Sequence, residues 1–449
     1  MAKKLWGGRF KKPMDKDFEA FSRSVQYDCK LAEYDVYHSM VHVRALRNSK
    51  ILSQTETATI LAALRQVLRQ VKSGTFGPSR DAEDIHTEIQ NRLAKKIGSL
   101  AQKLHTLRSR NDQVAFDEQW YCYESGMQFY SLLEDLIAGL RQLGERYAKE
   151  PFVGYTHMQR AQVILFSDYL QAYAGMFRRD ADRMRFFFET TTPTLGAGAL
   201  AGSSLSRRDY AQAIHEFMKE KKGAKLQPVH SALDQVSDRD FVVEFLGILA
   251  IVQMHLSRLS EDCILYATQE FNYFDLPEEF CTGSSLMPHK KNPDFLELVR
   301  GYTGRIYGNH AAVLMTMKGL PLSYNRDMQL DKEPMFSSVE IVKDELRIMA
   351  KFIRKITLNK KALAQALADE RLYATELAEA LVRKDVAFEA AHEVVGRVIR
   401  YSQDEGVAIR DIPDTTLRSF HAALSRSLVR GVMNWEYAVA SKKTMVRQE

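Results

Sequence analysis

The rarity of helix breakers inside long periodic stretches constrains this chain more than any other feature. Glycine and proline number only 23 and 11 in 449 residues, and no proline occurs between Asn111 and Pro151. At about 1.5 Å per residue, such stretches form rods up to ~55 Å long, which bury their apolar sides best in a bundle. The sequence therefore predicts an all-α fold with long helices over residues 111–148, 162–189, 233–269, 293–319 and 332–355.

Composition and charge limit the classes of function. Apolar residues make up 45% of the chain and charged residues 27%, which is typical of a globular protein and excludes a disordered one. The net charge is +6, but basic residues alternate with acidic ones, so we expect no nucleic-acid partner. The N-terminal segment lacks the apolar core of a secretory signal, and the apolar run Phe245–Val252 is too short to span a bilayer. We expect a cytoplasmic protein with no membrane partner.

One long stretch is apolar on nearly every face. Between Phe241 and Leu259, apolar residues occur all around the predicted helix, and such a helix must be covered on all sides. Partner subunits best supply this cover in a chain of this size, and burial at the centre of a single chain is the alternative. We place an N-terminal helical domain at 1–108, the long-helix bundle at 109–357 and a C-terminal helical domain at 358–449.

The loop between the third and fourth predicted helices gathers groups that suit an anion. Residues 281–300 read CTGSSLMPHKKNPDFLELVR. The Asn-Pro-Asp run at 292–294 is typical of a helix start, where free N–H groups and the helix dipole attract negative charge. The two lysines at 290 and 291 add cations beside it. A solvated loop with an ordinary helix cap is the alternative, but the Gly-Ser-Ser turn in the same loop favours an anion site.

Three further segments place polar groups at predicted helix ends. Arginine forks suit carboxylates, and hydroxyls and amides can bind their remaining oxygens. Capping by the serine and asparagine, and a structural role for the histidine, are the alternatives. Together the segments suit a polyanionic small molecule that undergoes proton transfer. They contain Arg108, Ser109, Arg110 and Asn111 in HTLRSRNDQVAFD, Thr156 and His157 in GYTHMQRAQ, and Tyr324, Asn325, Gln329 and Lys332 in LSYNRDMQLDKE.

Several other kinds of site are excluded. His38 and His42 have i, i+4 spacing but no third ligand, so we predict an ordinary helix face and no metal. A nucleotide-binding P-loop is absent, and a hydrolase triad of Ser284, His157 and a carboxylate lacks the GxSxG turn that would hold it. The four cysteines form no CxxC pair, which favours a reducing compartment over disulfides.

The motif GSSLMPHKKNPD at residues 283–294 resembles the shared signature of the fumarase/aspartase superfamily. Five further motifs in the same order make the chain similar to the argininosuccinate lyase branch. They are LWGGRF (5–10), EDIH (83–86), RSRNDQV (108–114), GYTHMQRAQ (154–162) and YNRDMQLDKE (324–333). The motifs cover the chain to about residue 333, and none lies in the last 115 residues.

The resemblance implies a three-domain, almost all-helical fold whose central bundles assemble into a homotetramer, with each active site built from three subunits. It implies cleavage of argininosuccinate to arginine and fumarate without a metal or an organic cofactor. Two alternatives remain open at this point. One is a sibling lyase that acts on another succinyl compound such as adenylosuccinate, and the other is a structural relative without activity, as in lens crystallins.

Residue roles follow from the matched motifs alone. Ser284 matches the catalytic serine and His157 the catalytic histidine, and we favour Ser284 as the base, activated by Lys290 and the helix N-terminus. His157 then acts on the acid side, with Glu297 as the acid that orients it. The resemblance assigns substrate binding to Ser24, Asn111, Thr156, Tyr324, Gln329 and Lys332, and Arg110 and Ser109 belong to the same shell.

Four positions depart from the family pattern. Leu107 stands where the family has glycine, and a bulky side chain there affects substrate affinity more than the reaction. His289 replaces a glutamine, as in branches that act on other substrates. Val163 and Thr194 replace prolines. None of these changes removes a proposed catalytic group.

Overall fold

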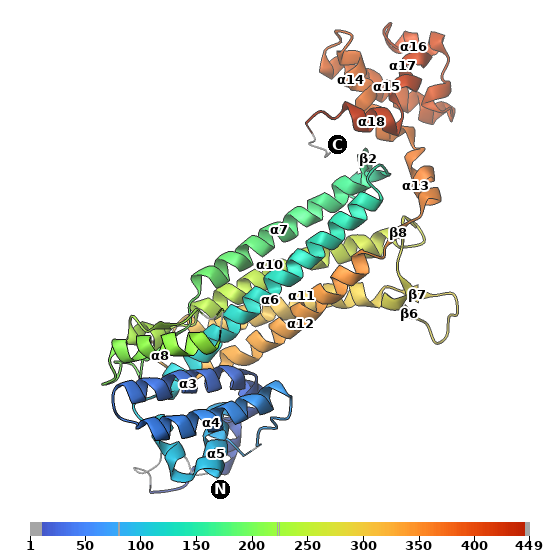
Figure 1. The fold of residues 1–449 in the computed structure, drawn as a ribbon. Coiled ribbons are helices and arrows are strands. Elements are labelled where there is room, and N and C mark those ends of the chain that lie inside the picture. The colour runs from blue at the N-terminus through green and yellow to red at the C-terminus, as the bar shows by residue number, and fades with distance from the viewer. Residues whose placement is uncertain (1–10, 80, 222, 224, 445–449) are drawn as a thin grey trace. The chain divides into compact units, whose positions relative to one another are not determined.

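The computed structural model describes residues 11–79, 81–221, 223 and 225–444, so the motif at residues 5–10 lies outside the described residues. Helices dominate the described chain, which confirms the predicted all-α class (Figure 1). The chain divides into two compact units. Unit 1 comprises Met1–Leu133, Arg179–Met254 and Gly301–Glu345, and unit 2 comprises Glu134–Arg178, His255–Arg300 and Leu346–Glu449.

The predicted long helices are present, and the boundary between the units falls within them. They are α6 (Arg110–Arg146), α7 (Phe166–Thr190), α10 (Asp240–Tyr266), α11 (Asp294–Met317) and α12 (Lys332–Ile353). The third predicted helix is in fact two, because α9 (Ala232–Ser237) ends before α10 begins. At the break, the Asp238 carboxylate accepts the backbone N–H groups of Arg239 and Asp240, and this local bonding competes with a continuous helix.

Unit 1 also contains the N-terminal helices, in which α4 shows how the sequence sets the packing. Ser53 and Glu56 form a capping box at its start, and Ile60, Leu64 and Val67 are fully buried. This face packs against α3 and α5 at the blue end of the ribbon in Figure 1. The remaining elements of unit 1 are α1 (Lys16–Phe21), α2 (Val25–Asp28), η1 (Cys29–Leu31), α3 (Ala32–Asn48), α4 (Gln54–Lys72), α5 (Ile85–Ile97), η2 (Gly98–His105), β3 (Thr194–Leu195), α8 (Arg207–Glu220), β4 (Gln227–Pro228) and η4 (Arg326–Asp331).

Unit 2 contains a β-hairpin where the sequence predicted a bend and a helix. Strands β1 (Pro151–Thr156) and β2 (Gln159–Leu165) pair antiparallel, so the helix predicted from residue 162 begins only at Phe166. That prediction was wrong because residues 152–165 satisfy their backbone groups across the hairpin. Phe152 and Val153 of β1 are buried and fix the register.

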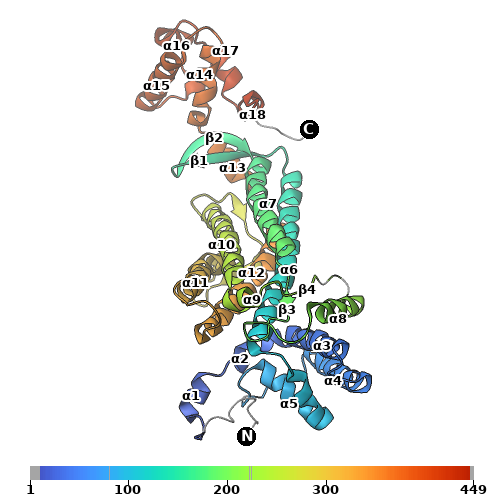
Figure 2. The same ribbon diagram turned by 90° about the vertical axis from the view of Figure 1, so that its left-hand side faces the viewer.

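The C-terminal helices of unit 2 form a small cluster of their own (Figure 2). Helices α14, α15, α17 and α18 pack around a shared apolar core, while α13 lies against β1 and both η5 and α18 lie against β2. The remaining elements of unit 2 are β5 (Phe274–Asp275), η3 (Glu278–Phe280), β6 (Thr282–Gly283), β7 (Lys291–Asn292), β8 (Thr357–Leu358), α13 (Lys360–Leu367), η5 (Glu370–Tyr373), α14 (Ala374–Val382), α15 (Phe388–Glu405), η6 (Ile409–Asp411), α16 (Asp414–Phe420), α17 (Arg426–Val432) and α18 (Trp435–Ser441).

The apolar helix α10 is largely covered by its own chain. Most of its apolar side chains are buried, and Met254 is the most exposed of the large ones at 37%. By length and composition alone α10 could also cross a membrane, although half of its most apolar window is already buried. The neighbouring helix α11 instead carries exposed apolar side chains along its length, namely Leu298, Tyr302, Tyr307, Leu314 and Met315. The surface that calls for a cover therefore lies on α11.

Candidate active site

The Ser284 loop of unit 2 is closed at its base by a short antiparallel strand pair. Strands β6 and β7 join Thr282 to Asn292 and Gly283 to Lys291, so the intervening residues form a hairpin-like loop before α11. Within it, the Ser284 hydroxyl accepts backbone N–H groups from Leu286 at 3.3 Å and Met287 at 3.0 Å. Two N–H donors aimed at one oxygen stabilise negative charge on it.

The lysines of this loop behave differently from each other. Lys291 donates to the Asp275 carboxylate at 2.7 Å and to the Leu276 carbonyl at 2.8 Å, and the carboxylate raises the pKa of Lys291. Lys290 is exposed and forms no hydrogen bond or ion pair through its side chain with the described residues. Lys290 thus remains available to an external anion, whereas Lys291 holds the loop to the preceding segment.

His157 lies at the tip of the β1–β2 hairpin. Thr156 pairs with Gln159 across the strands, which leaves His157 and Met158 as a two-residue turn with φ angles of +53° and +59°. Two left-handed residues define a type I′ turn, which glycine and asparagine usually occupy. The hairpin therefore holds the imidazole at its tip through a conformation that costs free energy for these residue types.

The candidate residues of unit 2 lie on separate exposed segments. Thr156, His157, Lys290 and Glu297 are exposed, and Ser284 is half-buried. Within the described part of this unit, no hydrogen bond or ion pair joins Glu297 to His157 or Lys290 to Ser284.

The candidate residues of unit 1 are more buried than those of unit 2, and Ser24 is one of them. Its hydroxyl donates to the Asp28 carboxylate at 2.6 Å, and its backbone N–H donates to the Glu83 carbonyl at 2.9 Å. Asp28 also accepts the N–H of Ile85 at 3.1 Å, and burial raises the pKa of Asp28 to about 6. Asp28 therefore fastens Ser24 to the start of α5.

Arg110 joins the same place from the start of α6. Its guanidinium pairs with Asp84 at 2.7 Å and donates to the Thr87 hydroxyl at 2.7 Å. The Arg110 guanidinium and hydrogen bonds from Thr87 hold the pKa of Asp84 below its usual range despite burial. Ser109 accepts the N–H of Asn111 at 3.2 Å, and the Asn111 amide donates to the Ala199 carbonyl at 3.0 Å. These bonds orient the first turn of α6.

Gln329 and Tyr324 approach this group from the segment before α12. The Gln329 amide donates to the Tyr27 hydroxyl at 3.0 Å and to the Ser22 carbonyl at 3.3 Å. Burial raises the pKa of Tyr324, against the attraction of the nearby Lys332. Gln329 thus contacts Ser22 and Tyr27, which lie on either side of Ser24 in the sequence.

Lys332 is the most enclosed of the candidates. Its ammonium group pairs with Asp331 at 3.0 Å and with Glu118, while Arg239 lies 2.8 Å from Glu118 and 3.3 Å from Asp331. These four side chains are at most 5% exposed. Burial raises the pKa of Glu118 to about 7, and the two carboxylates raise the pKa of Lys332. We call these residues the four-charge cluster.

The turn before Arg108 is strained. Leu107 has a φ of +57°, a left-handed conformation that explains why the family pattern has glycine at this position. Beneath the turn, Arg108 donates to the Ser39 hydroxyl at 2.8 Å and lies 3.3 Å from His38 Nδ1.

His42 bridges the Tyr210 hydroxyl and the Thr106 carbonyl at 2.9 Å each. The two histidines are fully buried rather than on an open helix face.

One buried group in the described chain has metal-ligand residue types. Ligand atoms of Asp35, His86 and Asp117 lie within 4.8 Å of one another. His86 Nδ1 is already 2.9 Å from Asp35, which also accepts the Gln113 amide at 2.6 Å. His86 and Asp35 are therefore already hydrogen-bonded to each other, and the Asp117 carboxylate lies 3.8 Å from His86 Nδ1.

Sequence reasoning missed the carboxylates that hold these side chains. Asp28, Asp84, Glu118 and Asp331 were not predicted as site residues, although Asp84 and Asp331 stand inside quoted motifs. The four-residue spacing of Ser24 and Asp28 on one helix face was a usable signal. At Thr194, which stands where the family pattern has proline, the backbone N–H donates to the Gln119 side chain at 3.1 Å. A proline has no N–H and cannot make this bond.

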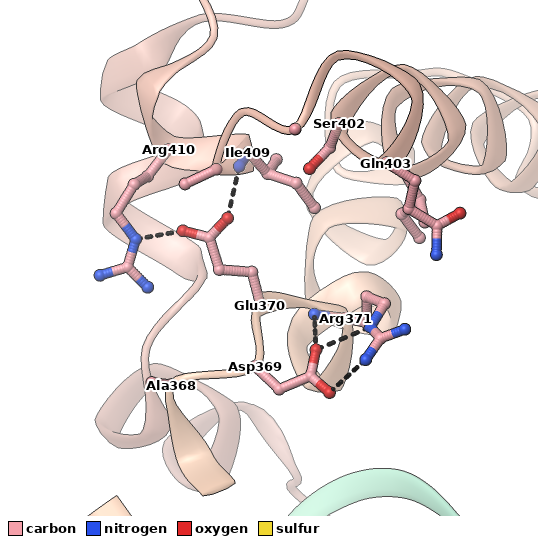
Figure 3. A pocket seen from close by; sticks show the side chains of 11 residues that line it. Ala368, Asp369, Glu370, Arg371, Ser402, Gln403, Ile409 and Arg410 are labelled. Atoms are coloured by element: carbon pink, nitrogen blue, oxygen red, sulfur yellow. Dashed lines mark hydrogen bonds and ion pairs between the residues drawn. The ribbon is translucent and has the colours of Figure 1, made fainter. Parts of the chain in front are cut away.

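Two cavities of about 460 Å³ each lie in unit 2. One is lined by Tyr155, Met158 and Arg160 beside the His157 turn. The other lies among the C-terminal helices, where Glu370 extends toward Arg410 and Ile409 while Asp369 binds Arg371 (Figure 3). Its charged groups are already paired with one another, so it offers no free charge to a ligand.

Known proteins match this sequence and fold. A lyase family model matches residues 8–308, and a model of the argininosuccinate lyase C-terminal region matches residues 371–440. The chain is 43% identical to an argininosuccinate lyase of Syntrophotalea carbinolica over 94% of this chain and 90% of that protein. It is 44% identical to an argininosuccinate lyase of Geobacter metallireducens over 92% of this chain and 88% of that protein.

Solved structures share the fold at lower identity. EDDS lyase in complex with formate superimposes with a TM-score of 0.77 at 24% identity, covering 95% of this chain and 84% of that one. A class II fumarase from Schistosoma mansoni gives a TM-score of 0.77 at 16% identity, with 94% of each chain covered.

Proposed function

The chain belongs to the argininosuccinate lyase family, and from that premise we propose that it cleaves argininosuccinate to arginine and fumarate with the residues described above. The reaction serves arginine biosynthesis. The single observation that carries the residue assignment is the Ser284 hydroxyl, which accepts two backbone N–H groups in the signature loop. An oxygen with two fixed donors can bear the charge of a serine that has lost its proton.

The chemical problem is removal of a proton from carbon beside a carboxylate, a very weak acid. Ser284 takes this proton, and Lys290, exposed and unpaired among the described residues, stabilises the charge that develops on the neighbouring carboxylate. The C–N bond then breaks, and the leaving guanidine nitrogen takes a proton from the acid side. His157 supplies it, with Glu297 as the carboxylate that orients the imidazole.

Substrate carboxylates and the arginine part bind to the groups of unit 1 and the hairpin. Arg110 and Lys332 supply charge, while Ser24, Ser109, Asn111, Thr156, Tyr324 and Gln329 supply hydroxyls and amides. The bonds of Ser24 to Asp28 and of Arg110 to Asp84 support this assignment, because they hold binding groups in fixed positions before substrate arrives.

We infer a cytoplasmic homotetramer in which the active sites are shared between subunits. The exposed apolar side chains of α11, including Leu314 at 43% and Met315 at 63%, support a second copy of this chain as the cover. The exposure of His157 and Glu297 in one chain supports completion of the site by another.

The decisive experiment follows the release of fumarate from argininosuccinate by the purified protein, through its absorbance at about 240 nm. We expect ready turnover by the wild type and a fall of about a thousandfold in kcat for Ser284→Ala, the middle of the range for loss of a general base. Ser285→Ala removes the neighbouring exposed hydroxyl and is the matched control, with kcat near wild type. Undiminished activity of Ser284→Ala would remove the role given to Ser284.

The same assay separates this function from that of a sibling lyase. The 43–44% identity to curated argininosuccinate lyases over nearly the whole chain favours argininosuccinate as the substrate. Turnover of adenylosuccinate with none of argininosuccinate would overturn the proposal. An assembled but inactive protein would indicate a structural relative.

A further inference from the structure

The four-charge cluster balances its own charge inside unit 1. Lys332 and Arg239 are the cations, and Glu118 and Asp331 are the carboxylates. They come from separate segments, since Glu118 lies on α6, Arg239 precedes α10, and the adjacent Asp331 and Lys332 lie at the end of η4 and the start of α12. Every member is at most 5% exposed, so water screens their interactions little.

Glu118 decides the net charge of the cluster. With all four groups ionised, two cations face two carboxylates and the sum is zero. Without the charge of Glu118, Lys332 and Arg239 would face Asp331 alone, and the interior would carry one uncompensated positive charge. A buried site in that state attracts an anion strongly, because low polarity strengthens the pairing.

Resting on the proposed function, in which Lys332 binds a substrate carboxylate, we propose that Glu118 is the internal counter-ion of Lys332 and sets the affinity of this lysine for the substrate. The Glu118 carboxylate contacts the Lys332 ammonium group directly and repels a second carboxylate that approaches it. Glu118 is a positioning residue, because it acts on substrate through Lys332. Its presence keeps the affinity lower than an unpaired lysine would give.

The test replaces the charge of Glu118 and keeps its size. In Glu118→Gln the amide oxygen can still accept from Lys332. We expect KM for argininosuccinate to fall at least tenfold, because one unit charge a few ångströms away at an effective dielectric constant of about 20 changes the binding free energy by more than the ~1.4 kcal/mol of one decade. We expect kcat to stay within about twofold, because the group does not contact the reacting atoms.

A second readout does not depend on turnover. Melting is followed with arginine and, separately, with fumarate, which between them carry the carboxylates of the substrate. The product whose carboxylate binds Lys332 should raise the Tm of Glu118→Gln more than that of wild type, since it supplies the missing negative charge. Equal shifts for both products in both proteins would overturn the proposal.

Glu345→Gln is the matched control. Glu345 is another buried glutamate of unit 1, about 20 Å along α12 from Lys332 by helix rise, and burial raises its pKa to about 8. This variant should change Tm without changing KM or the response to products. A KM decrease there as large as in Glu118→Gln would show a general effect of replacing a buried glutamate and would contradict the proposal.

A charge-restoring variant keeps the test decisive. Glu118→Gln/Arg239→Met removes one charge of each sign, so KM should return toward wild type. If Glu118→Gln alone does not fold, Arg239→Met, with a net charge of −1, is compared with the double variant and should have the higher KM. An unchanged or raised KM in Glu118→Gln would overturn the role of Glu118. Absence of fumarate release by wild type would instead contradict the proposed function, and the melting experiment would still decide on Glu118.

Discussion

The candidate residues of the two units differ in how firmly a single chain holds them. In unit 1, Lys332 is buried in the four-charge cluster and Arg110 is fixed between Asp84 and Thr87. In unit 2, His157 and Lys290 are exposed and stand on a hairpin tip and a loop. The groups proposed for binding in unit 1 are thus placed in advance, while the groups proposed for proton transfer lie on segments whose surroundings one chain leaves open.

This difference has a physical rationale. A group that binds a carboxylate gains from rigidity, because it loses little freedom when the ligand arrives. Groups that exchange protons must meet substrate in a water-poor site, which an exposed loop and hairpin reach only when another surface covers them. We call Lys332 and Arg110 of unit 1 the closed half of the site, and His157 and Lys290 of unit 2 the open half. We therefore expect the positions of the groups in the open half to depend on assembly, and those in the closed half not to depend on it.

The largest expected effect is mutual rescue of two inactive variants. Lys332→Met removes a cation of unit 1, and Ser284→Ala removes the hydroxyl of unit 2. If each site combines units from different copies, mixing the two after mild dissociation and reassembly gives some intact sites, with activity at least ~10-fold above either parent. Sedimentation of the mixture verifies that the proposed tetramers have formed again.

The control for rescue uses two variants of the same loop. Ser284→Ala mixed with Lys290→Met should stay inactive, because both residues enter a site from one copy. If the pair from different units also fails to recover while tetramers form, each site takes both residues from a single chain, and the inferred sharing is wrong.

The next largest effect is the difference in the free energy of unfolding between variants of Lys332 and Lys290. Lys332→Met leaves two buried carboxylates with one cation, which should lower the free energy of unfolding by about 3 kcal/mol. Lys290→Met changes an exposed side chain and should stay within ~0.5 kcal/mol of wild type. Urea unfolding at a single protein concentration measures both. Similar losses for the two variants would remove the distinction between the closed and open halves.

The sequence predicted the helices well because their periodicity is a local property. The buried stripe of α4 and the starts of α6, α11 and α12 agree with the pattern of apolar residues and breakers. The hairpin was missed because its turn residues, His157 and Met158, are not the glycine or asparagine that announce a type I′ turn. Local preference was overridden there by pairing across the strands.

The candidate residues were found through motifs, but their partners were not. Glu118 and Arg239 meet only because α6 and the start of α10 are brought together in unit 1, and no local pattern encodes that contact. The role of Glu118 as a counter-ion is thus a property of the fold. Asp331 stood beside Lys332 in the sequence, yet adjacency alone does not show that the pair is buried.

A smaller effect tests whether the carboxylate behind Ser24 carries a buried charge. Asp28 has a pKa raised to about 6, against about 3.9 in an unfolded chain. Between these values the folded state keeps a proton that the unfolded state has released, so this group lowers stability as pH rises from about 4 to about 6. Asp28→Asn removes that loss, and its stability relative to wild type should increase by about 2.5 kcal/mol between pH 4 and pH 7. A constant difference across this range in chemical unfolding would contradict the assignment.

The smallest effect concerns the strained turn that leads into Arg108 and the first turn of α6. Leu107 adopts a φ of +57°, which costs a residue with a Cβ atom about 1–2 kcal/mol, whereas glycine adopts it freely but gains entropy in the unfolded chain. Leu107→Gly should therefore stabilise the protein by about 1 kcal/mol and lower KM, since Ser109, Arg110 and Asn111 follow directly on a relaxed turn. Leu107→Ala removes the side chain but keeps the strained φ, so it should gain little stability. If alanine and glycine stabilise equally, the cost lies in the exposed leucine side chain and not in the backbone.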